Sequence, residues 1–210
     1  MKPVDGFRPE GLIGVRRYNS YEEYLQHQGS KLAESGDRLR EISQKKNRDQ
    51  RFCDRFDQMK RNVDIQGSVL CLGARLGDEV RGFRLAGFPA VGVDVNPGRN
   101  NADVIAADFH YLPFAADSFD GAYSNVMDHV LDVHRFMHET IRVVKANGWV
   151  YLELTGGVDQ IGRADPWGAM VWETNEDLVA VLRPYIKQMR YDREEANRRV
   201  LVFTPNKEKV

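Results

Sequence analysis

The sequence has 210 residues, enough for one domain of about 150 residues with an extension, which excludes a short peptide module and a large multidomain assembly. Hydrophobic residues make up 42% and charged residues 29%, which is typical of a globular protein and excludes a fibrous or disordered chain. The formal net charge is −1, so no overall field draws the chain to nucleic acid or to an anionic membrane.

Cysteine usage and hydropathy indicate the compartment. Cys53 and Cys71 are too few for a disulfide framework, and Cys71 lies in an apolar run, so we expect reduced thiols. No stretch approaches the roughly 18 apolar residues of a membrane span, and residues 1–11 contain no apolar signal core. The sequence therefore predicts a cytoplasmic protein with no membrane and no nucleic-acid partner.

The first part of the chain differs in charge from the rest. Residues 1–62 carry 14 Lys and Arg against 10 Asp and Glu, whereas residues 63–210 carry 16 against 21. Ser20 and Glu23 have the spacing of a capping box, which predicts a helix that begins near Tyr21. Gly29 and Gly36 are expected to divide this helical region. We therefore predict an N-terminal helical extension over 1–62 and a second domain over 63–210.

Two side-chain patterns mark the end of this extension. An apolar stripe at spacings of four, three and four is expected to dock on the neighbouring domain, although it could also face a partner or cover a substrate. It consists of Phe52, Phe56, Met59 and Val63. A basic stripe nearby is either a solvated helix face or a contact for an anionic partner. It consists of Lys45, Lys46, Arg48, Arg51 and Arg55.

From Ser68 onward, short apolar runs alternate with segments of helical period. Such alternation predicts a parallel sheet with helices on both faces, that is, a doubly wound α/β domain. The predicted strands are 69–72, 90–95, 104–107, 121–124, 149–154, 186–191 and 200–203. The predicted helices are 79–86, 131–144 and 175–182.

Open parallel sheets bind ligands at the carboxyl ends of their strands, where the first strand turns into its helix. Here that turn lies between Gly73 and Gly77, whose glycines allow a tight bend and a close backbone approach to a ligand. The same turn can equally be structural, because many strands lead into helices without binding anything.

Two carboxylates follow at the ends of the next predicted strands. Asp94 lies 21 residues after Gly73, where an acid can accept both hydroxyls of an adenosine ribose. Asp108 ends the third strand, from which a carboxylate can meet an adenine amino group. The alternatives are that Asp94 caps the following turn and that Asp108 caps a helix or turn. Together with the glycine turn, the two acids predict recognition of adenosine.

Several segments in this order resemble class I S-adenosylmethionine-dependent methyltransferases, particularly the small type 11 branch. The resemblance covers roughly residues 68–154 and rests on the segments VLCLGARLG, AVGVDVNPG, AADFHYLPFAADSFDGAYSNVMDHV and RFMHETIRVVKANGWVYLEL. It implies a Rossmann-like, mostly parallel seven-stranded sheet in which strand 200–203 inserts antiparallel beside the fifth strand. It also implies S-adenosylmethionine as the cofactor.

The resemblance assigns roles to residues by position. Those lining the methionine portion of the cofactor would be Gly73, Ala74, Arg75 and Gly77. Those holding the ribose would be Asp94 with its neighbours Val95 and Asn96, and those reading the adenine would be Asp108 and the backbone of Phe109. Those under the sulfonium would be Asn125, Val126 and Met127. His129 falls where family members often have a histidine that faces the substrate.

The first motif departs from the family at two positions. Cys71 stands where the family usually has an acid that helps to hold the cofactor's ammonium group, and Arg75 stands where it usually has glycine. Arg75 could point out of the turn and pair with Asp78 or Glu79, or it could clamp the cofactor's carboxylate. Alternatively the pocket has changed ligand, since an arginine beside a helix start favours an anion such as phosphate.

The chemistry of methyl transfer from a sulfonium makes few demands on side chains beyond alignment and exclusion of water. A hydroxyl acceptor would benefit from a general base, for which the candidates are His129, Asp128, His110 and Glu153. We favour His129, whose alternative is a helix-start histidine bonded to backbone. Glu153 points into the cleft or pairs with a basic residue.

Metal binding is not predicted. The histidines at 134 and 138 lie four residues apart, but no third ligand accompanies them. The long segment 155–174 contains Trp167 and Trp172, which could wall an acceptor pocket or pack as a small core of their own, and Arg163, which could meet an anionic acceptor.

The prediction for function is therefore methyl transfer from S-adenosylmethionine to a small-molecule acceptor, with oxygen as the favoured acceptor atom. The alternative is a non-catalytic protein of the same fold that binds an adenosine ligand, which the changes at Cys71 and Arg75 would allow. A nicotinamide-dependent oxidoreductase is disfavoured because the third glycine of its G-x-G-x-x-G motif is absent at the required spacing.

Overall fold

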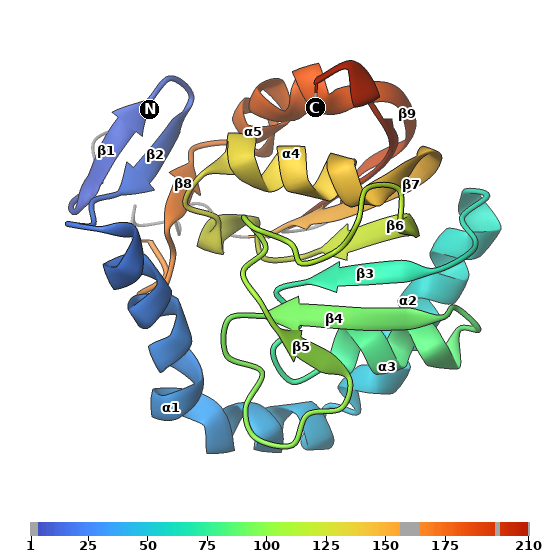
Figure 1. The fold of residues 1–210 in the computed structure, drawn as a ribbon, viewed down its shortest axis with the longest axis horizontal. Coiled ribbons are helices and arrows are strands. Elements are labelled where there is room, and N and C mark those ends of the chain that lie inside the picture. The colour runs from blue at the N-terminus through green and yellow to red at the C-terminus, as the bar shows by residue number, and fades with distance from the viewer. Residues whose placement is uncertain (1–3, 156–163, 196–197, 210) are drawn as a thin grey trace.

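The computed structural model describes residues 4–155, 164–195 and 198–209. Its centre is a sheet with the strand order β5-β4-β3-β6-β7-β10-β9 (Figure 1). In chain order these strands are β3 (Val69–Leu72), β4 (Ala90–Asp94), β5 (Val104–Ala106), β6 (Phe119–Ser124), β7 (Val144–Leu154), β9 (Ile186–Glu195) and β10 (Arg198–Pro205). Neighbours from β5 to β7 are parallel, whereas β10 is antiparallel to β7 and to β9. The predicted mostly parallel, seven-stranded sheet is confirmed, including its antiparallel insertion.

Helices cover both faces of this sheet, as the doubly wound prediction requires (Figure 1). One face carries α2 (Arg48–Asn62) and α3 (Asp78–Leu85), and the other carries α4 (Val133–Val143) and α5 (Asn175–Leu182). Successive side chains of β3 alternate between the two faces: Val69 and Cys71 pack with α2 and α3, Leu70 and Leu72 with α4. The continuous apolar strands therefore contribute side chains to two separate hydrophobic layers, one on each face of the sheet.

The longest helix, α1 (Tyr21–Lys45), begins where the sequence predicts. The Ser20 hydroxyl accepts a hydrogen bond from the backbone amide of Glu23. The prediction that glycines divide this helix is wrong, because α1 runs unbroken through Gly29 and Gly36. A glycine costs a helix only about 1 kcal/mol, and burial of Tyr24 and Leu32 against the domain offsets that cost.

The apolar stripe of α2 docks on the domain, as expected. The Phe56 ring is fully buried and stacks on the Phe83 ring of α3 with 3.5 Å between centroids. Phe52 and Met59 are buried on the same face of α2. This packing anchors the C-terminal half of the extension and leaves α1 lying beside the carboxyl ends of β3 and β4 (Figure 1).

A second, three-stranded sheet was not predicted. It consists of β1 (Phe7–Glu10), β2 (Ile13–Arg16) and β8 (Met170–Trp172), in the order β1-β2-β8. Residues 7–16 are too short and polar to show a strand pattern. They form an antiparallel β1–β2 pair, and the distant β8 pairs with β2 as the third strand.

Short 3₁₀ helices complete the described elements. They are η1 (Met127–His129), η2 (Arg183–Tyr185) and η3 (Lys207–Lys209). None of the helices in the described ranges is both long enough and apolar enough to cross a bilayer.

Candidate functional site

The turn after β3 requires its first glycine. Gly73 has φ of +74°, and a Cβ atom there would come within 2.5 Å of a Val126 methyl group. Gly77, with φ of +81°, is the residue before α3. Arg75 also has a positive φ, +37°, so it adopts the left-handed conformation that glycine adopts most easily. The turn thus keeps a glycine-like backbone at a position occupied by arginine.

Asp94 closes this turn from the end of β4. One of its carboxylate oxygens accepts the Arg75 amide at 3.0 Å, and the other accepts the Asn96 amide at 2.8 Å. The capping alternative for Asp94 is therefore realised. It does not exclude a ligand, because each carboxylate oxygen has a second lone pair to offer.

Asp108 is more heavily engaged. Its carboxylate accepts hydrogen bonds from the Tyr21 hydroxyl and from the backbone amide of His110. Burial by itself would raise the pKa of Asp108, but the hydrogen bonds from His110 and Tyr21 lower it. The turn-cap alternative is observed here too, and the role of Asp108 toward adenine stays a prediction.

Two adjoining cavities open at the carboxyl ends of β3, β4 and β6. The central cavity, of about 230 Å³, includes Glu79 of α3 and Asn125 in its lining. The narrow cavity, of about 30 Å³, lies between α1 and the end of β4. The described residues that line both are Lys31, Gly73, Arg75, Val126 and His129.

Most of the predicted binding residues face one of these cavities. Those that do are Gly73, Ala74, Arg75, Asp94, Val95, Phe109, Asn125, Val126 and His129. Four predicted residues are not among the described lining: Gly77, Asn96, Asp108 and Met127. The prediction for Met127 is not met because its side chain is fully buried in the hydrophobic core on the α4 side of the sheet. Gly77 and Asn96 instead shape the turns on either side, through the start of α3 and the hydrogen bond to Asp94.

His129 is enclosed by three elements and has a defined tautomer. Its Nδ1 lies 3.0 Å from the carbonyl oxygen of Trp167, which can only accept, so Nδ1 carries the proton. Its Nε2 lies 3.1 Å from Nζ of Lys31 on α1. Burial lowers the pKa of His129, and the nearby Lys31 and Arg75 cations lower it further. The charge of Asp128 raises the pKa, but the net shift is downward. The imidazole is therefore neutral near pH 7, with the Nε2 lone pair at the cavity.

Comparison with known proteins identifies the domain that carries these cavities. Residues 70–152 match the family model of a methyltransferase domain. This segment is a methyltransferase domain. It has the Rossmann-like fold of the class I S-adenosylmethionine-dependent methyltransferases, similar to type 11. No curated protein matches the sequence.

Solved structures share the fold at low sequence identity. A Burkholderia thailandensis 1,6-didemethyltoxoflavin-N1-methyltransferase, with its substrate and S-adenosylhomocysteine bound, is 15% identical, with a TM-score of 0.67 over 94% of this chain and 97% of that chain. A Thermotoga maritima methyltransferase described as a possible histamine N-methyltransferase is 15% identical, with a TM-score of 0.61 over 83% and 98%. A Pyrococcus horikoshii protein is 20% identical, with a TM-score of 0.57 over 71% and 86%.

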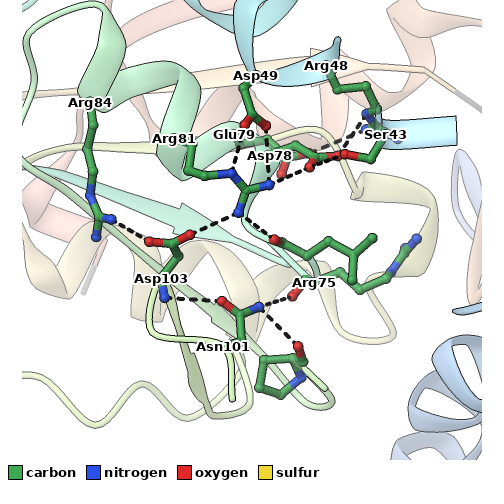
Figure 2. Close-up of polar contacts among 12 residues, drawn as sticks. Ser43, Arg48, Asp49, Arg75, Asp78, Glu79, Arg81, Arg84, Asn101 and Asp103 are labelled. Carbon is green, nitrogen blue, oxygen red and sulfur yellow. Dashed lines mark hydrogen bonds and ion pairs between the residues drawn. The ribbon is translucent and has the colours of Figure 1, made fainter. Parts of the chain in front are cut away.

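Arg75 of the methyltransferase domain does not pair with the acids predicted for it. Asp78 is bound instead by Arg48 at 3.1 Å and by Arg81 at 2.7 Å, and Glu79 lies 3.8 Å from Arg48. Figure 2 shows the Arg75 side chain pointing away from this cluster. Among the described residues its guanidinium has no hydrogen bond or ion pair, so it is available to a ligand in the cavity.

The second departure, Cys71, is compensated nearby. Cys71 is buried, and the Glu79 carboxylate is close enough to contribute to the raised pKa of its thiol after burial itself. Glu79 lines the central cavity and accepts a hydrogen bond from Asn125 at 3.3 Å. Burial raises the pKa of Glu79. A carboxyl group is thus present beside the position where the family's acid is missing.

The other predicted bases are occupied. The Glu153 carboxylate accepts hydrogen bonds from Arg55 at 2.6 Å and from Arg198 at 3.0 Å, so the pairing alternative holds for it. His110 is fully buried and contacts Asp108. Asp128 lines the central cavity, and burial raises its pKa.

The two tryptophans of segment 155–174 have separate roles. Trp167 packs against α1, where its ring lies 5.4 Å from Nζ of Lys31. Trp172 is buried in β8, and its indole nitrogen donates to the Asn175 side chain. The two indoles therefore neither form a common wall of an acceptor pocket nor pack together as a small core. Arg163 lies outside the described residues.

Residues of α1 complete the site and were not predicted. Lys31 lines both cavities, Tyr24 donates its hydroxyl proton to the His129 carbonyl at 3.1 Å, and Gln28 donates to the Trp167 carbonyl at 2.7 Å. These three residues are spaced i, i+4 and i+7, which places them on one helix face. That spacing is the signal the sequence offered, but it does not tell which domain surface the face meets.

Proposed function

We propose that this protein transfers a methyl group from S-adenosylmethionine to a hydroxyl group of a small molecule. The observation that carries the proposal is the meeting, in one cavity system, of the glycine turn, the Asp94 carboxylate and the neutral His129. All three belong to a domain that matches the methyltransferase family.

The residues present suit the cofactor. Asp94 would accept the ribose hydroxyls, with Val95 and Phe109 beside the adenine. Glu79, in place of an acid at Cys71, would hold the ammonium group, and the guanidinium of Arg75, which has no ion pair with any described residue, would hold the carboxylate. Because the narrow cavity has only about 30 Å³, side chains of α1 must shift to admit the adenosine.

The bound cofactor would supply a methyl carbon already activated by a positive sulfur. Transfer of this methyl group to the acceptor oxygen would leave the electron pair of the carbon–sulfur bond on sulfur. The hydroxyl proton would move to Nε2 of His129, which is the unprotonated nitrogen of the ring because Nδ1 donates to the Trp167 carbonyl. From there it leaves to solvent when the product departs.

Lys31 and Trp167 position this base. The Trp167 carbonyl fixes the tautomer from the Nδ1 side. Nζ of Lys31 occupies the place beside Nε2 that the acceptor hydroxyl takes during the reaction. Burial lowers the pKa of Lys31, with the Arg75 charge adding to the effect.

The test is titration calorimetry with S-adenosylmethionine, S-adenosylhomocysteine and NAD, followed by a transfer assay. We expect binding of the first two ligands, weakened at least about tenfold by Asp94→Ala. The matched control is Asp37→Ala, which removes a fully exposed acid of α1 and should leave affinity unchanged. Binding of NAD alone would overturn the proposal.

The transfer assay uses a radiolabelled methyl donor and metabolite pools, with product structures determined by mass spectrometry and NMR. We expect a methyl ether or ester. Two of the structural neighbours are described as N-methyltransferases, so a methylated nitrogen is the second candidate and would replace oxygen as the acceptor atom. Tight cofactor binding without transfer to any pool would favour the non-catalytic binding protein.

A further inference from the structure

A basic pocket of about 280 Å³ adjoins the central cavity on the α2 side of the sheet. Its lining includes five cationic side chains: Lys46, Arg48, Arg51, Arg55 and Arg198. We call these five residues, with the pocket they line, the basic pocket. The one described acid in its lining is Glu153, on β7.

Among the described residues, the cations of the basic pocket outnumber the carboxylates that pair with them. Arg55 and Arg198 share the single carboxylate of Glu153, at 2.6 and 3.0 Å. Arg48 is balanced by Asp78 at 3.1 Å. The side chain of Arg51, by contrast, has no hydrogen bond or ion pair within the described part of the chain, and neither has that of Lys46. As far as the described residues go, the pocket therefore has more cations than carboxylates in a concave surface, which concentrates anions.

Two arginines of the basic pocket, Arg48 and Arg55, lie over the ring of Phe52. Arg48, Arg51, Phe52 and Arg55 are spaced i, i+3, i+4 and i+7, so they share one face of α2. The guanidinium carbons of Arg48 and Arg55 lie 5.5 and 5.1 Å from the centroid of the Phe52 ring. Such cation–π contacts order the guanidinium groups before a ligand arrives, which reduces the entropy lost on binding.

The basic pocket is continuous with the central cavity. Arg48, Asn125 and Thr155 line both of them. A single small molecule can therefore place one group in the basic pocket and another in the cavity that contains His129. With a volume of about 280 Å³, the pocket accommodates a carboxylate or phosphate group of a small molecule.

The geometry points to an acceptor that carries a carboxylate or phosphate group, which the basic pocket binds while the hydroxyl lies in the central cavity. This inference rests on the proposed function. Arginine suits the task because its planar guanidinium binds either anion through two parallel hydrogen bonds. The cofactor's own carboxylate is the other source of the same chemistry, and the test distinguishes the two.

The first experiment titrates inorganic phosphate into the protein saturated with S-adenosylhomocysteine, at an ionic strength held constant with chloride. We expect saturable binding that Arg51→Gln weakens about tenfold. The matched control is Arg61→Gln, because Arg61 is an exposed arginine of the same helix that is not in the described lining of the basic pocket. Equal phosphate affinity in the two variants would overturn the inference.

The same variants separate the acceptor from the cofactor. We expect Arg51→Gln to leave the affinity for S-adenosylhomocysteine unchanged. If that affinity falls in parallel, and the ligand displaces phosphate, the basic pocket holds the cofactor's carboxylate and the inference is wrong. If phosphate binds through Arg51 but S-adenosylhomocysteine does not bind at all, the proposed function fails while the anion site stands.

A second experiment examines the acceptor itself. A metabolite extract is divided by anion exchange, and each fraction is incubated with the protein and radiolabelled methyl donor. Label in compounds from the retained, anionic fraction supports the inference, and the Arg51→Gln protein should need a correspondingly higher concentration of that fraction than the Arg61→Gln protein. Label confined to the unretained fraction would contradict it.

Discussion

Arginines gather at two places around α2, and they differ in how their charge is balanced. On the outer side, Arg81 donates from all three guanidinium nitrogens to Asp49, Asp78, Asp103 and the Leu76 carbonyl (Figure 2). In the basic pocket, two arginines share one carboxylate and Arg51 has no partner among the described residues.

The difference teaches how to distinguish structural from functional charge. A cation whose donors are all used by the protein cannot bind a ligand without breaking contacts. Arg81 is such a cation: its ion pairs join α3 to Asp49 of α2 and to Asp103, the residue before β5. Cations in excess around a cavity contribute little to folding and are left for an external anion. The same holds for Arg75, which lines the central cavity without an ion pair in the described ranges.

The largest expected effect is on catalysis, from substitution of His129, which faces the ligand cavity. His129→Gln should lower kcat by about 100- to 10,000-fold, because the acceptor loses its general base. Because burial lowers the pKa of His129 below its ordinary 6.5, the neutral base persists as the pH falls. The wild-type rate should therefore decline only below pH 6.5, and this acid limb should vanish in the variant. A variant with an unchanged pH profile would remove His129 from the mechanism.

Arg81→Gln should produce the next largest effect, on stability. It leaves Asp49, Asp103 and the 3% exposed Asp78 short of donors, and breaking such a network costs about 3 kcal/mol. Urea denaturation measures this loss. The control is Arg84→Gln, which removes a more exposed partner of Asp103 and should cost less than about 1 kcal/mol. Equal costs for both variants would mean that Arg81 is no more structural than a surface pair.

Arg75→Gly should move stability and affinity in opposite directions. Glycine relieves the left-handed backbone strain and should add about 1 kcal/mol to the free energy of unfolding. Loss of the guanidinium should weaken S-adenosylhomocysteine binding about tenfold. Asn100→Gly, at another exposed position of positive φ, is the control for affinity. If affinity rises in Arg75→Gly, the arginine obstructs the cavity instead of clamping the cofactor.

Arg51→Gln should have the smallest effect on folding. The Arg51 side chain is exposed and has no hydrogen bond or ion pair in the described part of the chain. The free energy of unfolding of the variant should therefore stay within about 0.5 kcal/mol of that of the wild type. Thermal and urea denaturation measure it beside the phosphate titration. A loss comparable to that of Arg81→Gln would erase the distinction between the two groups of arginines.

Local patterns predicted the domain well because its elements are defined by nearby residues. Short apolar runs gave the strands, and the pair Thr174 and Asp177 forms a full capping box at the start of α5. The glycine turn and Asp94 were also found from the sequence, since a doubly wound sheet brings the carboxyl ends of its parallel strands to one edge. The antiparallel position of β10 came from the family resemblance, because periodicity does not encode strand order.

The sequence alone determined the sheet, the turn and the acid of the candidate site, because hydrophobic period and turn chemistry act over a few residues. Tertiary structure decided what meets them: Lys31 beside His129, Glu79 beside Cys71, and which arginines pair with a carboxylate of the described residues. It also paired β2 with β8, which lies more than 150 residues further along the chain and is not indicated by either segment alone. Most of these contacts join residues far apart in the sequence, and the charge of the basic pocket depends on every carboxylate that folds next to it.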